Sequence, residues 1–388
     1  MPHLVHPPAP RADRGDATLT ILLAGGKGSR LHELTRAECK PAIHFAGHRR
    51  IVDFAMANAV RTGLDRMIVA TQYQPRSLTQ HLWDHWAMAF DCGKGLMLRH
   101  GPTLAGLEGY LGTADAVTRN MDEIDLIAPR DILILAADHI YEMDYGPMID
   151  AHRASGAAVT VAAHVVPRAG ASDFGIFLTD DTGHATAFLE KPLDPPGLPD
   201  DPARALASMG VYIFRWDWLR ATLLRDARDT ASSHDFGHDI LPPAVAEGQA
   251  MVWRFTGPPR SHAAPYWRDV GTLDAFRVTQ LDFLQPAPPC TLPDTAMPLP
   301  LPAAAPPRND GLLSDSVLMP GASVGAGARL HRTIVGPHTH IPGGMIIGED
   351  RDEDSRWFRR TPDGTVLVTA EMLHRREATR PRFRALVS

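Results

Sequence analysis

Four short runs rich in apolar residues limit what this chain can fold into more than any other feature of the sequence. They are TLTILLA (18–24), RMIVATQ (66–72), DILILAAD (131–138) and AAVTVAAHVV (157–166). None of them alternates apolar with polar residues, as a strand with one face in water does. Strands buried on both faces are typical of the parallel sheets of α/β proteins. The runs therefore predict a mostly parallel sheet covered by helices.

The segments between these runs carry the pattern of the covering helices. IVDFAMANAVRTG (51–63) has helical periodicity, and its final glycine suits a helix C-terminus. SLTQHLWDHWAM (77–88) and TADAVTRNMDEI (113–124) predict further helices. Strands that alternate with helices in this way indicate an α/β, Rossmann-like domain.

A hairpin and a proline-rich stretch complete this part of the chain. Residues 175–192 hold two strand-like stretches around a Thr-Gly turn, which predict a hairpin added to the sheet. Proline lacks a backbone donor and blocks helix, so the proline-rich residues 285–310 predict an extended linker. We expect a disordered tail at 1–16, the α/β domain at 17–284 and the linker at 285–310.

A repeat predicts a second, smaller domain at 311–388, which includes a C-terminal tail. Apolar residues recur every six positions in two series, Leu318-Val324-Leu330 and Val335-Ile341-Ile347. Hexapeptide spacing is the signature of a left-handed parallel β-helix, and a Gly/Pro-rich loop with this spacing by chance is the alternative. The pattern covers fewer than two coils, so we expect the domain to pack on the first domain or on another subunit.

Net charge, cysteine spacing and the lengths of the apolar segments argue against a nucleic-acid-binding, a secreted or a membrane protein. The chain has 39 Lys and Arg against 45 Asp and Glu, and this net charge of −6 argues against a nucleic-acid binder. Its three cysteines are scattered, as in proteins of a reducing compartment. There is no signal-like apolar segment at the start and no run near the roughly 20 residues that cross a bilayer. We expect a cytoplasmic protein without nucleic-acid or membrane partners.

A glycine-rich turn, AGGKGSR (24–30), follows the first apolar run. It places Gly25, Gly26 and Gly28 at the carboxyl end of a buried strand, the edge where open α/β sheets bind ligands. Glycine lets successive N–H groups converge on phosphate oxygens. The turn therefore predicts a phosphate site.

Spacing separates this turn from two familiar phosphate motifs. A Walker A loop has Ser or Thr after its lysine, whereas Lys27 is followed by glycine. The dinucleotide fingerprint needs a third glycine where this chain has Leu31. A plain tight turn would leave Lys27, Arg30 and Lys40 unexplained, because together these cations suit a triphosphate.

These features resemble the sugar-nucleotide pyrophosphorylases, and within them the glucose-1-phosphate adenylyltransferase family. The similarity spans nearly the whole chain except its tail, the proline-rich linker and the last residues. It continues through KPAIHFAGHRRIVDFAMANAV, TQYQPRSLTQHL, YLGTADAV, LAADHIYEMDY, FGIF, FLEKP, ASMGVYIF, SSHDFGHDILP, YWRDVGTLDAF and IPGGMIIGED.

The resemblance implies an enzyme that makes ADP-glucose and pyrophosphate from ATP and α-D-glucose 1-phosphate, the first committed step of glycogen synthesis. It implies Mg²⁺ as cofactor, held by Asp138 and Asp269. A helix or turn cap is the alternative for either aspartate. Arg30, Lys40 and Asp138 match the catalytic positions of the family.

Substrate-binding positions carry over in the same way. Lys191 matches the cation that grips the sugar phosphate, and Glu190 would accept hydrogen bonds from glucose. A solvated Glu-Lys pair is the alternative for these two, a structural hydroxyl for Ser208, and a packing aromatic for Tyr110. The implied nucleotide contacts are Gly25, Gly26, Gly28, Gln72 and Tyr110, and the implied sugar-phosphate or ADP-glucose contacts are Gly175, Glu190, Lys191 and Ser208.

The chain departs from the family pattern where effectors bind. Regulated members carry basic residues before the Lys-Pro, where this chain has Ala37-Glu38, although His44 and Arg50 still match effector positions. Gly109 replaces a tryptophan that is associated with signalling between sites. These departures weaken the expectation of ordinary allostery.

Two alternatives to ADP-glucose synthesis remain. One is a pyrophosphorylase for a different NTP or sugar phosphate, and the other is a non-catalytic regulatory paralogue. A homo-oligomer, a tetramer by family resemblance, is the expected assembly.

Overall fold

The computed structural model describes residues 17–93, 95–106, 108–257, 264–294 and 306–379. These residues divide into two units. The sheet unit contains the described residues of 17–27, 52–267 and 293–294, and the β-helix unit contains those of 28–51, 268–292 and 306–379. The tail predicted at 1–16 and much of the predicted linker lie outside the described residues. None of the described helices combines the length and hydropathy of a membrane span.

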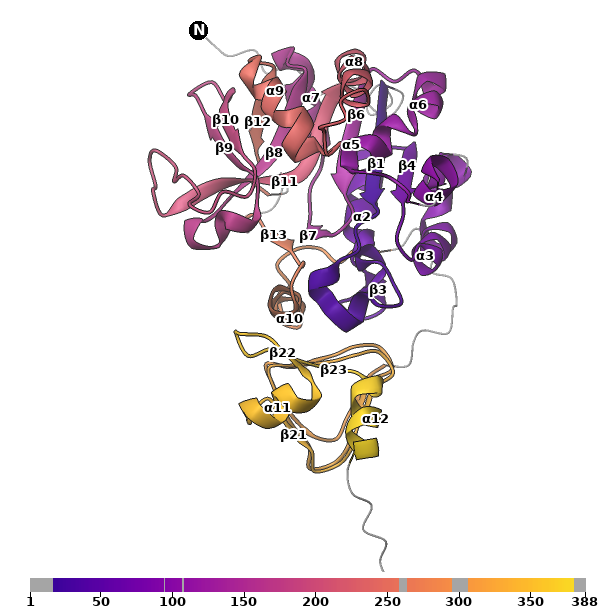
Figure 1. Ribbon diagram of the computed structural model, residues 1–388, viewed down its shortest axis with the longest axis vertical. Coiled ribbons are helices and arrows are strands. Elements are labelled where there is room, and N and C mark those ends of the chain that lie inside the picture. The colour runs from indigo at the N-terminus through magenta and orange to yellow at the C-terminus, as the bar shows by residue number, and fades with distance from the viewer. Residues whose placement is uncertain (1–16, 94, 107, 258–263, 295–305, 380–388) are drawn as a thin grey trace, which may run out of the picture. The chain divides into compact units, whose positions relative to one another are not determined.

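A mixed nine-stranded sheet forms the centre of the sheet unit (Figure 1). In its parallel half, β1 (Thr18–Ala24) lies between β4 (Met67–Thr71) and β6 (Asp131–Ala136), and β5 (Leu96–His100) follows β4. β11 (Arg204–Arg215) runs antiparallel to both β6 and β8 (Val159–Pro167). The four apolar runs are thus the strands β1, β4, β6 and β8, and the predicted α/β class is confirmed.

The predicted hairpin lies at one end of this sheet. β9 (Ile176–Thr179) pairs antiparallel with β10 (Ala185–Leu189), and β12 (Ala250–Arg254) pairs parallel with β8. Gly183 in the hairpin turn has φ +88°, a value that favours glycine.

The helices of the sheet unit follow the predicted pattern with one break. α2 (Val52–Thr62) ends at Gly63, whose φ is +84°, and α3 covers Arg76–Trp86. Residues 113–124 form two helices, α5 (Thr113–Thr118) and α6 (Met121–Ile127). The other helical elements and the short β7 are η3 (Ala87–Ala89), η4 (Asp91–Gly93), α4 (Gly101–Ala105), β7 (His139–Tyr141), α7 (Gly146–Ser155), η5 (Arg168–Asp173), α8 (Trp216–Asp226), η6 (Phe236–Ile240) and α9 (Leu241–Ala246).

Asn120 stands at the break between α5 and α6. It is fully buried, donates from Nδ2 to the Ala116 carbonyl at 2.7 Å, and accepts from Arg99 Nε at 2.9 Å. A buried amide must find such partners, and these bonds hold it where the helix direction changes.

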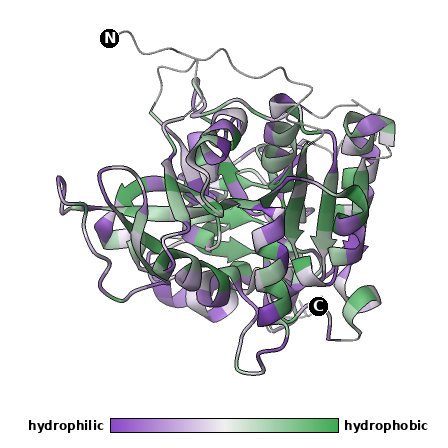
Figure 2. Cartoon of the chain, turned by 90° about the horizontal axis from the view of Figure 1, so that it is seen from above, coloured by the Kyte–Doolittle hydropathy of each residue, from purple (hydrophilic) through white to green (hydrophobic). Residues whose placement is uncertain are grey.

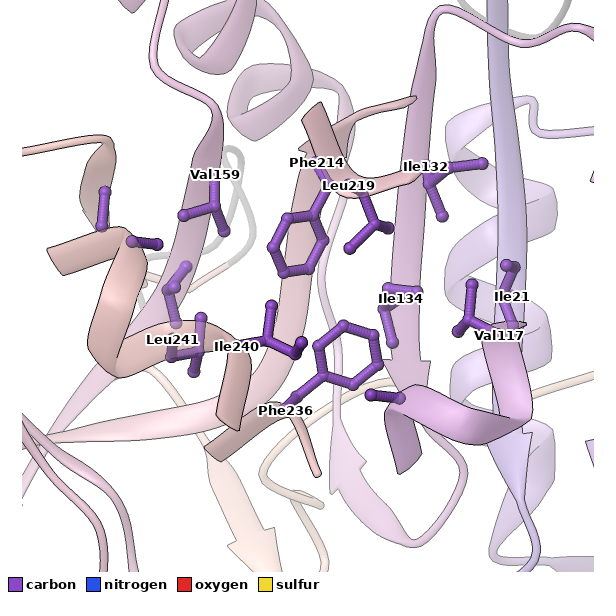
Figure 3. Close-up of a cluster of buried hydrophobic side chains, with 14 of the residues drawn as sticks. Ile21, Val117, Ile132, Ile134, Val159, Phe214, Leu219, Phe236, Ile240 and Leu241 are labelled. Atoms are coloured by element: carbon purple, nitrogen blue, oxygen red, sulfur yellow. The ribbon is translucent and has the colours of Figure 1, made fainter. Parts of the chain in front are cut away.

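Apolar side chains from strands and helices fill the interior of the sheet unit. Figure 2 shows hydrophobic residues concentrated on the strands. In Figure 3, Phe236 and Ile240 of η6 lie beside Ile134 of β6 and Phe214 of β11. The Phe214 and Phe236 rings have centroids 5.4 Å apart. This core fixes β6 and β11, which border the candidate site described below.

Short parallel strands stack into three sheets in the β-helix unit. Val324, Leu330, Val335, Ile341 and Ile347 of the predicted repeat are all buried in one core cluster, so the hexapeptide pattern is confirmed. The sheets are β14 (Arg308–Asn309), β17 (Ser323–Val324) and β20 (His340–Ile341); β15 (Leu312–Ser314), β18 (Arg329–His331) and β21 (Ile346–Ile347); and β16 (Val317–Leu318), β19 (Thr333–Val335), β23 (Val366–Val368) and β22 (Arg359–Arg360).

The β-helix is longer than predicted, since the sequence pattern indicated fewer than two coils. Leu313 pairs with Leu330 and Leu330 with Ile347, so successive coils are 17 residues apart. The apolar pattern does not predict the first strands, because residues 308–314 are largely exposed. It does not predict β23, because an insertion with α11 (Arg351–Trp357) precedes that strand. Phe358 and two residues of α12 (Ala370–Thr379), Met372 and Leu373, complete the core.

Segments from the predicted first domain also belong to this unit. They are η1 (Ser29–Thr35), η2 (Lys40–Ala42), β2 (His44–Phe45), β3 (Arg49–Arg50) and α10 (Leu273–Asp282). Arg277 of α10 donates from Nε to Thr365 Oγ1 and from Nη1 to the Asp315 carbonyl, each at 3.0 Å. The β-helix therefore does pack against other parts of the chain.

We predict that Ile341→Ala destabilises the β-helix unit. Ile341 is fully buried, and truncating such a side chain costs about 2–5 kcal/mol of unfolding free energy. The matched control is Ile346→Ala, because Ile346 is 48% exposed and its truncation should cost well under about 1 kcal/mol. Calorimetric unfolding checks both, and equal losses for the two variants would contradict the assigned core.

Candidate active site

The parallel strands bring three predicted site segments to one edge of the sheet unit. Ala24 at the end of β1 pairs with Thr71 at the end of β4, and Leu23 pairs with Ala136 at the end of β6. Gly25, Gln72 and Asp138 follow these strand ends. They therefore share the carboxyl edge, where open α/β sheets bind ligands.

The glycine turn begins at this edge. A Cβ on Gly25 would lie 3.3 Å from the Cβ of Gln72, whereas one on Gly26 would meet nothing within 4 Å. Lys27 is exposed, and its Nζ lies 5.6 Å from the centroid of the Tyr73 ring. This cation–π contact keeps Lys27 beside the turn. Tyr73 carried no signal in the sequence that would have singled it out.

Gln72 and Tyr110 bind each other through two hydrogen bonds. The Tyr110 N–H donates to Gln72 Oε1 at 2.9 Å, and Gln72 Nε2 donates to the Tyr110 carbonyl at 3.2 Å. The Tyr110 ring is buried, its hydroxyl accepts from Asn120 Nδ2 at 3.3 Å, and burial raises its pKa. These contacts fit the alternative that Tyr110 is a packing aromatic. Gln72 is then the polar side chain of this pair that lies at the sheet edge.

Gly109 has a conformation that glycine favours. Its φ is +73°, and a Cβ there would lie 2.8 Å from Cδ of Gln72. The local backbone and the nearness of the Gln72 side chain both favour glycine at this position.

Asp138 and His139 form the turn after β6. Asp138 Oδ1 lies 3.6 Å from His139 Nε2, and the Asp138 side chain is 36% exposed. His139 Nδ1 lies 3.0 Å from the Met209 carbonyl, to which only a protonated nitrogen can donate. In the neutral ring, Nε2 then carries a lone pair beside the carboxylate. Asp138 connects two strands and precedes no helix, so it is not a helix cap.

The predicted sugar-phosphate residues lie together around the β9–β10 hairpin. Glu190 Oε1 pairs with Lys191 Nζ at 2.9 Å. Glu190 Oε2 would lie 2.9 Å from a Cβ on Gly175 and 2.8 Å from one on Gly237. Any side chain at either glycine would displace this carboxylate. Gly237 was missed in the sequence, although it belongs to the quoted SSHDFGHDILP motif.

Lys191 and Ser208 differ in their surroundings. Lys191 is 60% exposed and has φ +46°, an uncommon conformation for a residue with a side chain. Ser208 donates its N–H to the Gly175 carbonyl at 2.8 Å. Its hydroxyl hydrogen-bonds to Tyr212, whose pKa burial raises to about 12. Ser208 thus also has the structural role named as its alternative.

In the β-helix unit, one carboxylate holds two predicted catalytic cations. Lys40 Nζ lies 2.7 Å from Asp269 Oδ1, and Arg30 Nη2 lies 3.6 Å from Oδ2. Lys40 is almost fully buried and Arg30 is more than half exposed. A buried ammonium needs such a partner, because desolvation disfavours an isolated charge.

Two glycines make room for these cations. Gly28 has φ +63°, and a Cβ there would lie 2.8 Å from the Cβ of Lys40. A Cβ on Gly271 would lie 2.8 Å from Arg30 Nη2. Next along the chain, Thr272 caps α10, since its Oγ1 accepts from the Ala275 N–H at 3.2 Å. Thr272, and not Asp269, is therefore the cap of this helix.

The two predicted effector positions, His44 and Arg50, are both half-buried. Arg50 donates from Nη1 to the Ala42 carbonyl at 2.5 Å and pairs with Glu38 Oε1 at 3.3 Å. The His44 carbonyl accepts from Gln280 Nε2 at 3.3 Å. The acidic residue that departs from the family pattern is thus an ion partner of Arg50.

Comparisons with known proteins agree with this arrangement. Residues 19–285 match the Nucleotidyl transferase family, and residues 308–368 match the GlmU-like C-terminal hexapeptide family. The chain is 40% identical to a glucose-1-phosphate adenylyltransferase of Jannaschia sp., over 92% of this chain and 97% of the relative. It is 40% identical to one from Cereibacter sphaeroides over 92% and 96%, and 39% identical to one from Granulibacter bethesdensis over 92% and 97%.

We predict that Gly28→Ala lowers stability and displaces Lys40. A left-handed conformation costs a residue with a Cβ about 1–2 kcal/mol, and the Lys40 contact adds to that cost. Gly26→Ala is the matched control, with a change within about 0.5 kcal/mol. Denaturant unfolding checks the pair. An unchanged midpoint for Gly28→Ala would show that the turn can rearrange at little cost.

Proposed function

We propose that this chain, which belongs to the glucose-1-phosphate adenylyltransferase family of nucleotidyl transferases, makes ADP-glucose and pyrophosphate from ATP and α-D-glucose 1-phosphate. Such an activity is the first committed step of glycogen or other α-glucan synthesis. The observation that carries the proposal is the shared sheet edge of Gly25, Gln72 and Asp138 in a chain that matches these relatives almost end to end.

The reaction sets a problem of charge. A phosphate oxygen of glucose 1-phosphate attacks the α-phosphorus of ATP, a new P–O bond forms, and the bond to pyrophosphate breaks. Both reactants are anions, so cations and exact placement lower the barrier more than covalent chemistry would. In our proposal Arg30 and Lys40 bind the triphosphate of ATP, and Asp269 holds the two cations in place before ATP binds.

The glycine turn would bind the nucleotide phosphates. In our proposal the backbone N–H groups of Gly25, Gly26 and Gly28 donate to phosphate oxygens, and Lys27 adds a cation beside them. Gln72, fixed by the Tyr110 backbone, is the proposed polar contact to the nucleotide.

The hairpin residues would bind the second substrate. We propose that Lys191 binds the phosphate of the sugar phosphate, because its exposed ammonium is a compact positive charge that suits a phosphate. Glu190 would accept hydrogen bonds from the glucose hydroxyls. Gly175 leaves room for this carboxylate, and Ser208 hydrogen-bonds to the Gly175 carbonyl. A direct contact of Gly175 or Ser208 with ADP-glucose remains a prediction.

A divalent cation, Mg²⁺ in our proposal, would be held by Asp138 and Asp269. The donor chemistry fits, since both are carboxylates and magnesium prefers oxygen ligands. Nε2 of His139 lies 3.6 Å from an Asp138 carboxylate oxygen, and with a neutral ring these two atoms would both be electron donors that a cation would stabilise. When bound, the ion offsets negative charge on the reacting phosphates.

A homotetramer is our proposal for the assembly. Leu312, Leu313 and Ile346 are apolar side chains exposed on the β15–β18–β21 sheet, which supports association through the β-helix unit. Light scattering would test the number of subunits. A cytoplasmic location remains a prediction from the sequence.

An assay of pyrophosphate release tests the function. The purified protein is incubated with glucose 1-phosphate, Mg²⁺ and each of ATP, UTP and dTTP, and release with ATP is expected. Release with UTP or dTTP but not with ATP would replace the adenylyl assignment. Absence of release with all three would favour a non-catalytic regulatory paralogue.

We predict that Asp138→Asn lowers kcat roughly 100-fold or more, the order lost when a group that stabilises transition-state charge is removed. The thermal midpoint should stay near that of the wild type, because the side chain is part-exposed in a turn. Asp122→Asn is the matched control, since Asp122 is 73% exposed and makes a loose 3.8 Å pair with Arg99. Activity retained by Asp138→Asn would remove Asp138 from the site.

We predict a weak response to fructose 1,6-bisphosphate. Glu38 repels an anionic effector and engages Arg50, one of the two matching effector positions. Glu38→Gln should therefore respond more strongly than the wild type when initial rates are measured against effector concentration. Strong activation of the wild type would show that Glu38 does not block this ligand.

A further inference from the structure

An ion pair within the β-helix unit connects the segment that carries Arg30 to the C-terminal part of the chain. Arg359 of β22 donates from Nη2 to Glu33 Oε1 at 2.7 Å and from Nε to Oε2 at 3.4 Å. Two parallel bonds from a guanidinium to both carboxylate oxygens fix orientation as well as distance. Glu33 belongs to η1, three residues after Arg30.

The Glu33 end of this pair is well shielded from water. Its side chain is 10% exposed, against 45% for Arg359. Burial raises the pKa of Glu33, but the hydrogen bond and positive charge of Arg359, together with a backbone hydrogen bond and the charge of His32, lower it by more, so the net pKa lies below its ordinary value. The bond between Arg359 and Glu33 also raises the pKa of Arg359. Both groups therefore stay charged at neutral pH.

The η1 segment needs support from outside. His32, between Arg30 and Glu33, has φ 52° and ψ −117°, which breaks the helical path. A strained backbone of this kind persists where its surroundings fix it. Thr35 Oγ1 supplies part of this support through bonds to the Gly28 carbonyl at 3.0 Å and the His32 carbonyl at 3.1 Å. The Arg359 fork supplies support from the β-helix.

The same hairpin also holds the segment that follows Asp269. In the turn between β22 and β23, Thr361 and Thr365 donate their hydroxyls to Asp274 Oδ1 at 2.9 Å and 2.5 Å. Asp274 lies in the first turn of α10, five positions after Asp269. One C-terminal hairpin thus contacts both chain segments that meet in the Arg30–Asp269 pair.

A pocket of about 450 Å³ lies among these segments. Arg30 and His32 line it from η1, Leu273 lines it from α10, and Thr361 and Pro362 line it from the hairpin turn. The hairpin is therefore a wall of the space that the exposed Arg30 side chain faces.

We propose that Arg359 is a positioning residue for nucleotidyl transfer. Through Glu33 it holds η1, and therefore Arg30, in the conformation that binds the triphosphate of ATP. The inference rests on the proposed function, in which Arg30 binds ATP. Arg359 itself touches no reacting group.

The test compares Arg359→Gln with the matched control Arg329→Gln. Arg329 makes a similar 2.9 Å pair with Glu349, with both partners about half exposed, but Glu349 lies outside η1. Arg359→Gln should raise KM for ATP roughly three- to tenfold, the effect of about 1 kcal/mol. KM for glucose 1-phosphate and the thermal midpoint should stay near wild type, a split that a general loss of folding would not produce. Arg329→Gln should change none of these values.

Two further variants separate the pair from other effects of the mutation. Arg359→Lys should recover part of the affinity, because lysine keeps the charge and cannot form the bidentate fork. Glu33→Gln should resemble Arg359→Gln, and the double variant should be no worse than either single variant if the two residues act as one unit. Additive losses would overturn the assignment.

Hydrogen exchange gives a readout that does not depend on activity. Amides of residues 29–36 should exchange faster in Arg359→Gln than in the wild type, and should be unchanged in Arg329→Gln. If the wild type releases pyrophosphate but Arg359→Gln keeps its KM for ATP and its exchange rates, the inference is wrong and the proposed function stands. If no NTP supports release, the proposed function fails, and faster exchange alone would still establish that Arg359 supports η1.

Discussion

The pairing of Lys40 with Asp269 is the interaction on which the candidate site depends. Lys40 has almost no contact with water, and an ammonium in that position is tolerable only beside a carboxylate. The residues around Lys40 and Asp269 accommodate this pair. Gly28 turns left-handed against the Lys40 side chain, Gly271 leaves space for Arg30, and Thr272 caps α10. The predicted catalytic cations Arg30 and Lys40 are thereby held by Asp269 in the absence of substrate, and such preorganisation would avoid rearranging them during the proposed reaction.

Much of the fold could be predicted because its strongest signals are local. The buried strands are uniform apolar runs, α2 ends at a glycine, and the β-helix repeats its apolar residues at fixed spacing. The break at Asn120 could not be predicted, because it depends on Arg99, 21 residues earlier. The length of the β-helix was underestimated because its first strands are exposed and its last strand follows an insertion.

The candidate site was predictable to a similar degree and for similar reasons. Motif residues such as Gly25, Glu190 and Lys191 were identified from their neighbours along the chain. His139 and Gly237 were not, since their importance lies in contacts with Asp138 and Glu190 that only the fold creates. The choice between a cap and a ligand at Asp269 likewise required the hydrogen bond of Thr272. The roles of the site residues in catalysis remain predictions.

The conformation of Gly109 constrains which substitutions this part of the chain can accept during evolution. The backbone of Gly109 is left-handed, and a Cβ there would lie 2.8 Å from Cδ of Gln72, whose amide is held by the backbone of the next residue, Tyr110. Replacing the glycine alone would strain the turn and push Gln72 out of place, so positions 72 and 109 are epistatic. A large residue at 109 would require the Gln72 side chain to move and the turn to take another conformation. A single substitution of Gly109 by an aromatic residue should therefore be unfavourable.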